Sequence, residues 1–255
     1  MRIISLILAS GVGSRLYPLS TEEKPKQFLK LISDKMIVED TLERYRLFSE
    51  KSYIVTLEKY QKYVENLQAK IVYERERKET ATSVFYGINA IKKDFDPKET
   101  IVIQTPSDHF VEENLDFIKT IEIAVFQAVK GKFVLIGVKP TRLETDFGYI
   151  KDGYEIIEKP SRIKAKKLIE NGYFWNTAIY VYRLDRMLDY FDKYFNHEKL
   201  SFEKMILPHI SSDSKVIYSH IKWEDLGTHE RLNSPERWVY TLGKRNEKNV
   251  KQIGN

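Results

Sequence analysis

Residues 8–29 constrain the fold of this chain more than any other segment. They follow Ile3–Leu8, a run whose length and apolar composition predict a buried β-strand. The loop after this strand contains two glycines, Gly11 and Gly13, and cations that include Arg15 and Lys26. Glycine lets the backbone turn sharply and lie close to a ligand. A strand, a glycine-bearing turn and paired cations together predict a polyphosphate-binding loop.

Two common nucleotide-binding patterns do not fit this loop. The third glycine of a G-x-G-x-x-G motif would fall at Leu16, and the chain has no Gly-Lys-Ser/Thr sequence of the P-loop type. A simple strand and turn with surface cations is the alternative. It leaves the pairing of Arg15 and Lys26 around a Pro-marked loop unexplained, so we favour phosphate binding.

The composition limits the class of protein. Hydrophobic residues make up 42% of the 255 residues, which excludes a disordered chain. No apolar run approaches the ~20 residues of a membrane span, no signal-peptide cleavage site follows the N-terminus, and cysteine is absent. We therefore expect a cytoplasmic protein without a membrane partner.

The net charge of +5 would suit nucleic-acid binding, but acidic residues accompany the basic ones almost throughout. We therefore expect no nucleic-acid partner. Only the C-terminal tail has a clear local excess of positive charge, from Lys244, Arg245, Lys248 and Lys251. We interpret this tail as a solvated terminus.

Strand-like and helix-like segments alternate along the chain. Strands are expected at 3–8, 52–57, 69–73, 100–105, 133–138, 148–151, 154–158, 178–183 and 215–221. Helices are expected at 36–47, 59–67, 80–91, 115–129, 163–171, 185–194 and 201–210. This alternation predicts an α/β fold with a mostly parallel central sheet flanked by helices. Ligands of such sheets bind beyond the carboxyl ends of the strands.

We expect one domain over residues 1–232. Residues 1 to about 140 would form its nucleotide-binding part, and residues 141–232 a smaller sugar-phosphate-binding part that covers the site as a lid. Residues 233–255 would form a short tail without a β-helix domain.

The sequence Pro106-Ser107-Asp108-His109 follows a predicted buried strand. Adjacent Ser, Asp and His cannot form a hydrolase triad, whose members converge from separate elements. Asp108 alone could be a turn former. It could also be a Mg²⁺ ligand, since Mg²⁺ commonly takes one or two carboxylates plus phosphate oxygens, and a second carboxylate is available at Glu224-Asp225.

Two further motifs are compatible with sugar binding. In Glu158-Lys159-Pro160, the lysine could bind a phosphate and the glutamate could accept sugar hydroxyls, although a strand-end salt bridge is an equally good interpretation. Asn176 stands beside Phe174 and Trp175 in an arrangement that suits sugar recognition, although aromatic core packing is commoner.

Together, these motifs resemble the sugar-nucleotide pyrophosphorylase superfamily, and most closely the mannose-1-phosphate guanylyltransferases. The matching segments occur in the family's order, at 10–16, 17–20, 25–29, 106–109, 137–150, 158–160, 175–178 and 223–227. The chain departs from the family pattern in several places: Ser10 and Ala178 replace glycines, Ser14 replaces threonine, and the segment at 76–81 is altered. The resemblance implies a Rossmann-like nucleotidyltransferase fold.

The resemblance also implies an activity. The chain would make GDP-mannose and pyrophosphate from GTP and mannose 1-phosphate, by in-line attack on the α-phosphate, with Mg²⁺ as cofactor. A homodimer is a candidate assembly. The alternatives are another pyrophosphorylase that uses dTTP or UTP with glucose 1-phosphate, or a non-catalytic homologue that binds sugar nucleotides.

The implied site residues fall into four groups. The catalytic residues are Arg15, Lys26 and Asp108. The nucleotide-binding residues are Ala9, Ser10, Gly11, Gly13, Ser14, Arg15, Glu79, Thr80 and Ser107. The sugar-phosphate-binding residues are Gly148, Glu158, Lys159 and Asn176. The metal ligands are Asp108 and Asp225.

Glu79 is a candidate for base recognition. A carboxylate can accept hydrogen bonds from both the ring N–H and the exocyclic amine of guanine, and bidentate charged pairs are strong. Uracil and thymine would place a carbonyl oxygen against the same carboxylate. A solvated glutamate at the start of a helix is the alternative.

Overall fold

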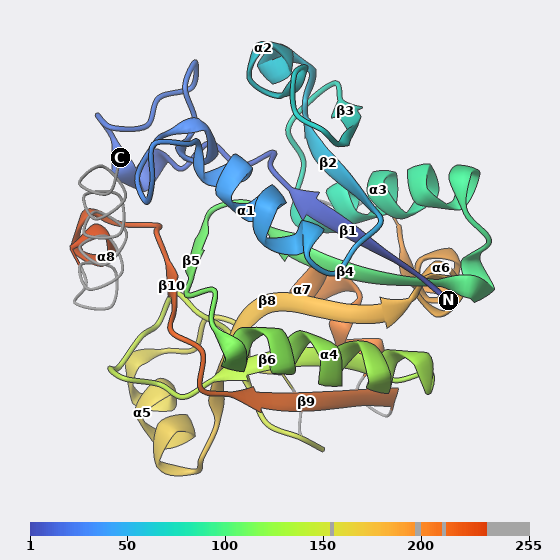
Figure 1. The fold of residues 1–255 in the computed structure, drawn as a ribbon. Helices are drawn as coiled ribbons and strands as arrows, with labels where there is room; N and C mark the ends of the chain where they lie inside the picture. The colour runs from blue at the N-terminus through green and yellow to red at the C-terminus, as the bar shows by residue number, and fades with distance from the viewer. Residues whose placement is uncertain (154–155, 197–199, 211–212, 234–255) are drawn as a thin grey trace, which may run out of the picture.

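The computed structural model of the chain describes residues 1–153, 156–196, 200–210 and 213–233. A central sheet has helices on both faces, and a small two-stranded sheet lies beside it (Figure 1). The large sheet has eight strands in the order β3-β2-β1-β4-β8-β6-β9, and β7 pairs with β8. These strands are β1 (Arg2–Leu8), β2 (Lys51–Leu57), β3 (Lys70–Glu74), β4 (Thr100–Pro106), β6 (Phe133–Val138), β7 (Tyr149–Ile150), β8 (Phe174–Arg183) and β9 (Ser214–Ser219).

The sheet is mostly parallel, as predicted. Strand β1 pairs in parallel with β2 and β4, and β6 with β9. The exception is β8, which runs antiparallel between β4 and β6. Because β8 comes from the second half of the chain and lies inside the sheet, both halves share one sheet.

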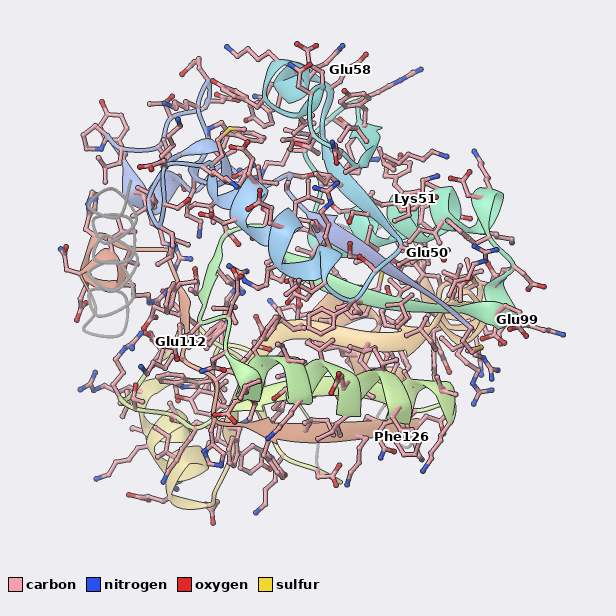
Figure 2. All side chains as sticks on the ribbon, in the orientation of Figure 1. Glu50, Lys51, Glu58, Glu99, Glu112 and Phe126 are labelled. Atoms are coloured by element: carbon pink, nitrogen blue, oxygen red, sulfur yellow. The ribbon has the colours of Figure 1, made fainter. Side chains whose placement is uncertain are left out.

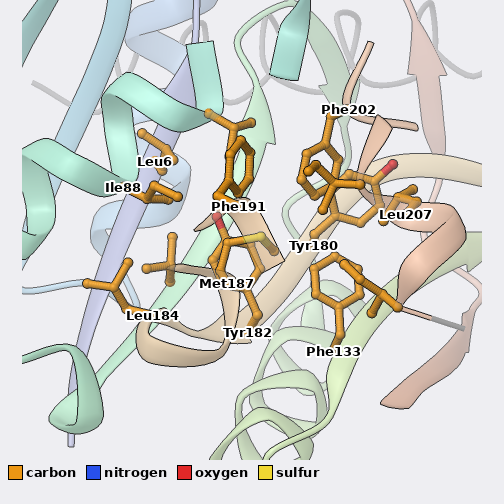
Figure 3. Close-up of a cluster of buried hydrophobic side chains, with 14 of the residues drawn as sticks. Leu6, Ile88, Phe133, Tyr180, Tyr182, Leu184, Met187, Phe191, Phe202 and Leu207 are labelled. Atoms are coloured by element: carbon orange, nitrogen blue, oxygen red, sulfur yellow. The ribbon is translucent and has the colours of Figure 1, made fainter. Parts of the chain in front are cut away.

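One face of the sheet is covered by α3 (Thr80–Asp94), α6 (Leu184–Tyr194) and α7 (Phe202–Met205). Their apolar side chains form a continuous buried cluster with the sheet, in which Leu6 meets Ile88, and Phe191 lies near Phe202 and Tyr180 (Figure 3). Each fully buried side chain of this size contributes about 1.5–3 kcal/mol. This cluster fixes α7 beside Tyr180 in the middle of β8, next to the carboxyl end of β4.

The opposite face is covered by α1 (Ile37–Arg46) and α4 (Leu115–Val129). The side chain of Asn114 caps α4 by accepting a hydrogen bond from the Phe117 amide at 3.0 Å. The inner face of α4 is buried, whereas Phe126 on its outer face is 57% exposed, beneath the Lys130 ammonium (Figure 2). The helix ends before Gly131, whose φ of 86° fits the predicted glycine stop.

Two short strands, β5 (His109–Val111) and β10 (Trp223–Asp225), form the second sheet. They pair antiparallel with His109 opposite Asp225. We did not expect these strands, because three residues are too few to show an alternating pattern.

Several expected elements differ from the structure in extent. The helix expected at 59–67 is a 3-10 turn, Glu58–Tyr60, followed by α2 (Gln61–Val64). The helix expected at 201–210 is divided into α7 and the 3-10 turn Leu207–His209, where Pro208 cannot continue a helical hydrogen-bond ladder. Residues 154–155 of the strand expected at 154–158 and residues 234–255 of the expected tail lie outside the described residues.

Within the described part of the chain, no helix has both the length and the apolar character needed to cross a bilayer. The remaining helices are α5 (Arg162–Glu170) and α8 (His229–Leu232).

Candidate active site

The glycine loop leaves the carboxyl end of β1 and is supported by the residues that follow Pro25. The Gln27 side-chain amide donates hydrogen bonds to the carbonyl oxygens of Ala9 at 2.7 Å and Gly11 at 2.9 Å. Gly13 has a φ of 73°, and a Cβ there would lie 2.6 Å from Cβ of Lys26. Only glycine therefore fits at position 13, and the loop and Lys26 are built against each other.

Ser10, which replaces a glycine of the family pattern, has a polar partner. Its hydroxyl donates to the buried carboxylate of Glu74, which also accepts from the Ser83 hydroxyl at 3.1 Å. Burial raises the pKa of Glu74, and the two hydroxyls partly offset that effect. Among the described non-glycine residues, only Lys159 and Ala178 have positive φ. The serine is therefore accommodated without left-handed strain.

Ser14 and Arg15 lie in the 3-10 turn Ser14–Leu16 and are exposed. The Arg15 side chain is 52% exposed and pairs with the Asp146 carboxylate. Its guanidinium thus lies at the rim of the site, where it is accessible to a polyphosphate but already has a carboxylate partner.

Lys26 lies between the two predicted metal-binding carboxylates. Its Nζ is 2.7 Å from Oδ2 of Asp108 and 3.3 Å from Oδ1 of Asp225. The Lys26 side chain is 5% exposed. Three residues that are far apart in the sequence therefore converge on one buried position.

The small sheet brings these carboxylates together. Asp108 immediately precedes β5, and Asp225 ends β10 opposite His109. Ser107 anchors the same segment, since its amide donates to the Leu8 carbonyl at 3.0 Å and its own carbonyl accepts from the Thr41 hydroxyl at 3.2 Å.

The other acidic residue of β10 has a different partner. Glu224 accepts two hydrogen bonds from the Arg142 guanidinium, at 2.7 and 2.9 Å. Because neighbouring side chains on a strand point to opposite faces, Asp225 alone is presented to Lys26. The residues alone left both acidic side chains as candidates and the family resemblance selected Asp225; the structure gives the two carboxylates different partners.

The charges in this cluster reinforce one another. Burial opposes the charged form of Lys26, but Asp108 and Asp225 outweigh it and raise the pKa of the ammonium. Burial raises the pKa of Asp225, but Lys26, His109 and Arg231 together have a larger and opposite effect. The resulting pKa is about 2, below its ordinary value of 3.8. Burial lowers the pKa of His109, whose Nδ1 accepts a hydrogen bond from Trp223 at 3.2 Å. Asp225 is therefore ionised at neutral pH.

The arrangement fits a Mg²⁺ site that is completed by a substrate. One oxygen of Asp108 and one of Asp225 both approach the Lys26 ammonium, and oxygen is the ligand that Mg²⁺ prefers. The described residues contain no group of three or more His, Cys, Asp or Glu side chains suited to a metal. Asp108 and Asp225 could hold a Mg²⁺ ion if phosphate oxygens and water supplied its other ligands.

A cavity of about 200 Å³ opens beside this cluster. Its walls come from the glycine loop, the start of α3, β4, β8 and α7. Sequence-predicted residues in the walls are Ser10, Gly11, Glu79, Thr80 and Asp108. The walls also include Ala178, Tyr180 and Glu203, which lie on β8 and α7.

The predicted sugar-binding residues form a second group. A Cβ at Gly148 would lie 2.7 Å from Oε2 of Glu158 and 3.3 Å from Cβ of Asn176, so the backbone at 148 lies close against both side chains. Lys159 follows with a φ of 44°, and its Nζ lies 3.5 Å from Oε1 of Glu158. The Lys159 side chain is 63% exposed, so the structure places it at the outer edge of the site.

Asn176 connects this group to the cavity through hydrogen bonds. Its amide nitrogen donates to the Tyr180 hydroxyl at 2.7 Å, and that hydroxyl donates to Oε1 of Glu203 at 3.3 Å. The Thr80 hydroxyl lies 3.5 Å from the other Glu203 oxygen and accepts from the amide of Phe202. Burial, and next the charge of Glu203, raise the pKa of Glu158 to about 7.

Sequence reasoning missed several charged residues of the site, among them Asp146, Glu203 and Arg231. Glu203 lies on a one-turn helix, in a sequence that resembles an ordinary surface helix. Arg231 follows the Asp225 motif in a polar stretch. Neither position has a local signal, because each acquires its partners only when distant segments meet.

Comparison with known proteins places the chain among transferases. Residues 4–236 match the sequence model described as nucleotidyl transferase. The chain is 31% identical over 209 residues to a mannose-1-phosphate guanylyltransferase of Escherichia coli, and the alignment covers 73% of this chain and 45% of that protein. The chain thus spans about half the length of the curated relatives that it matches.

Solved structures share the fold. The crystal structure of a mannose-1-phosphate geranyltransferase from Thermus thermophilus has a TM-score of 0.79 at 24% identity, over 89% of this chain and 77% of that chain. A structure of a mannose-6-phosphate isomerase from Helicobacter pylori has a TM-score of 0.74 at 25% identity, over 88% of this chain and all of that chain. The predicted family resemblance and fold class are confirmed.

Proposed function

Because this chain belongs to the nucleotidyl transferase family, we propose that it makes GDP-mannose and pyrophosphate from GTP and mannose 1-phosphate. One observation carries the proposal: Lys26 lies between Asp108 and Asp225, beside a glycine loop and a cavity of about 200 Å³. The similarity to a mannose-1-phosphate guanylyltransferase supports the choice of substrates.

The reaction is a single displacement at phosphorus. An oxygen of mannose 1-phosphate attacks the α-phosphorus of GTP and forms a new P–O bond. The bond between the α-phosphorus and the oxygen that bridges to the β-phosphate breaks, and its electron pair leaves with pyrophosphate. The attacking phosphate is already an anion, so no covalent enzyme intermediate is needed, and the enzyme contributes positioning and charge stabilisation.

The charged residues have separate tasks in this proposal. Mg²⁺ held by Asp108 and Asp225 would neutralise charge on the phosphates. Lys26 and Arg15 would stabilise the departing pyrophosphate, and Lys159 would neutralise the sugar phosphate. The two substrates are both anions, so cations at these positions would lower the cost of bringing them together.

The uncharged contacts come from the loop and the cavity. Backbone and side-chain groups of 9–14 and Ser107 would surround the triphosphate, while the base would lie against Glu79 and Thr80. Gly148, Glu158 and Asn176 would bind the mannose. Glu203 would add a second carboxylate acceptor where the two substrates meet, since its partners come from both parts of the site.

Pyrophosphate release over a matrix of nucleotides and sugar phosphates tests the proposal. We expect the highest kcat/KM with GTP and mannose 1-phosphate, and a loss of roughly 10²–10³ in turnover for Lys26→Ala and Asp108→Ala. Lys35→Ala, which removes an exposed lysine, is the matched control and should retain full activity. A preference for UTP or dTTP with glucose 1-phosphate would replace our substrates. Binding of sugar nucleotides without any release would indicate a non-catalytic homologue.

A further inference from the structure

A line of ion pairs with alternating charges crosses the site. In order, its members are Arg15, Asp146, Arg231, Asp225, Lys26 and Asp108. We call this line the ion-pair chain. It joins both cations proposed to bind pyrophosphate to both carboxylates proposed to bind metal.

Arg231 is the central cation of the ion-pair chain, and it is the most firmly held. Its side chain is 5% exposed, and its Nη2 lies 2.9 Å from Glu144 and 3.2 Å from Asp146. Its Nη1 lies 3.2 Å from Oδ2 of Asp225, and the guanidinium lies 4.4 Å from the centre of the Phe147 ring. The contacts come from three directions, so Arg231 cannot move without breaking several of them.

The two oxygens of Asp225 have different partners. Oδ1 lies 3.3 Å from the Lys26 ammonium, whereas Oδ2 lies 3.2 Å from Arg231. The Asp225 side chain is 16% exposed. If Lys26 moved to a phosphate and Asp225 had no second cation, a nearly buried charge would lose its partner, which is costly. Arg231 removes most of that cost.

We propose that Arg231 is a positioning residue, which holds Asp225 by Oδ2 so that Oδ1 can exchange Lys26 for the metal that accompanies the nucleotide. This inference rests on the proposed function. The same guanidinium keeps Asp146 paired when Arg15 turns to the triphosphate, because Oδ2 of Asp146 contacts both arginines. Lys26 and Arg15 can then both leave their carboxylates, because Arg231 keeps Asp225 and Asp146 paired.

Residues that orient metal ligands commonly change metal affinity by roughly 10- to 100-fold when they are replaced. We therefore expect Arg231→Gln to weaken GTP binding by that factor in the presence of Mg²⁺. In EDTA, where no metal takes Oδ1, the loss of GTP affinity should be clearly smaller than in Mg²⁺. A purely structural role would weaken both affinities together.

Isothermal titration of GTP, with Mg²⁺ and with EDTA, measures this difference directly. Arg142→Gln is the matched control, because it removes an arginine that pairs with Glu224, the neighbour of Asp225, and it should leave the Mg²⁺-dependent gain in affinity unchanged. If Arg231→Gln fails to fold, Arg231→Lys replaces it. A single ammonium cannot reach all three carboxylates, so this variant should lose part of the Mg²⁺-dependent affinity.

A second comparison tests whether Arg231 acts through Asp225. In an Asp225→Asn background, Arg231→Gln should cause no further loss of Mg²⁺-dependent affinity. A full additional loss would overturn the proposal, as would equal losses in Mg²⁺ and EDTA or a wild type whose GTP affinity does not depend on Mg²⁺. Pyrophosphate release by the wild type, measured separately, shows whether the proposed function itself fails.

Discussion

Replacing Lys26 by methionine should destabilise the protein in a way that Mg²⁺ reverses. The substitution leaves two carboxylates facing each other across a position where the lysine side chain is 5% exposed. Removing one partner of a buried ion pair typically costs about 3–5 kcal/mol. Asp225 keeps Arg231, and the Asp108 side chain is 28% exposed, so we expect a loss near the lower end, about 3 kcal/mol.

The pKa of Asp225 supports this magnitude. A pKa of about 2, compared with its ordinary value of 3.8, corresponds to about 2 kcal/mol of charge stabilisation, which Lys26 shares with His109 and Arg231. Because the folded pKa is the lower one, this stabilisation is complete above pH 3.8 and is lost as the pH falls towards 2. The loss of folding stability in Lys26→Met should therefore be complete at neutral pH and become smaller below pH 3.8.

Urea denaturation at neutral pH, in EDTA and in Mg²⁺, measures the effect. Lys35→Met removes a lysine whose pair with Glu43 is about half exposed, so this control should change stability by about 0–1 kcal/mol. Mg²⁺ should stabilise Lys26→Met more than the wild type, where the ammonium competes for the same oxygens. If Lys26→Met is as stable as Lys35→Met, or does not respond to Mg²⁺, our account of the cluster is wrong.

Three further predictions concern the cavity walls. Burial, together with the negative charge of Glu203, raises the pKa of Glu158 to about 7, and Glu203→Gln removes that charge. The pH at which KM for mannose 1-phosphate falls should therefore be lower in this variant than in the wild type, and coincident pH profiles would refute this. Glu79→Gln should reduce the preference for GTP over UTP tenfold or more, since a hydrogen bond to a charged group contributes about 1.5–3 kcal/mol, and an unchanged ratio of kcat/KM values would remove Glu79 from base recognition. Ala178 has a φ of 55°, so Ala178→Gly should raise the free energy of unfolding by up to about 1 kcal/mol, whereas Ala165→Gly within α5 should lower it.

The sequence predicts most of the fold because long elements have clear patterns. The apolar runs of β1, β2, β4 and β6, and the helical spacing of α1, α3 and α4, are each repeated over enough residues to be recognised. The position of β8 inside the sheet could not be predicted. Its residues form a strand by composition, but the order of strands depends on contacts between residues more than 70 positions apart.

The candidate site likewise has residues that the sequence predicts and residues that it does not. Lys26, Asp108 and Asp225 were predicted because each lies in a recognisable motif, and the structure brings them together. Glu203 and Arg231 were not predicted, because a charged residue on a one-turn helix looks the same whether it faces solvent or a cavity. Their roles depend on distant partners such as Asp146, which no local pattern specifies.

The central claim is that the phosphate of mannose 1-phosphate attacks the α-phosphorus of GTP, and the most direct test traces the oxygen atoms of that phosphate. The enzyme is given GTP and mannose 1-phosphate labelled with ¹⁸O in its phosphate, and both products are analysed by mass spectrometry. In-line attack by the sugar phosphate on the α-phosphorus predicts that the label is retained entirely in GDP-mannose and that pyrophosphate contains none. Label in the pyrophosphate, or pyrophosphate release without labelled GDP-mannose, would contradict the account.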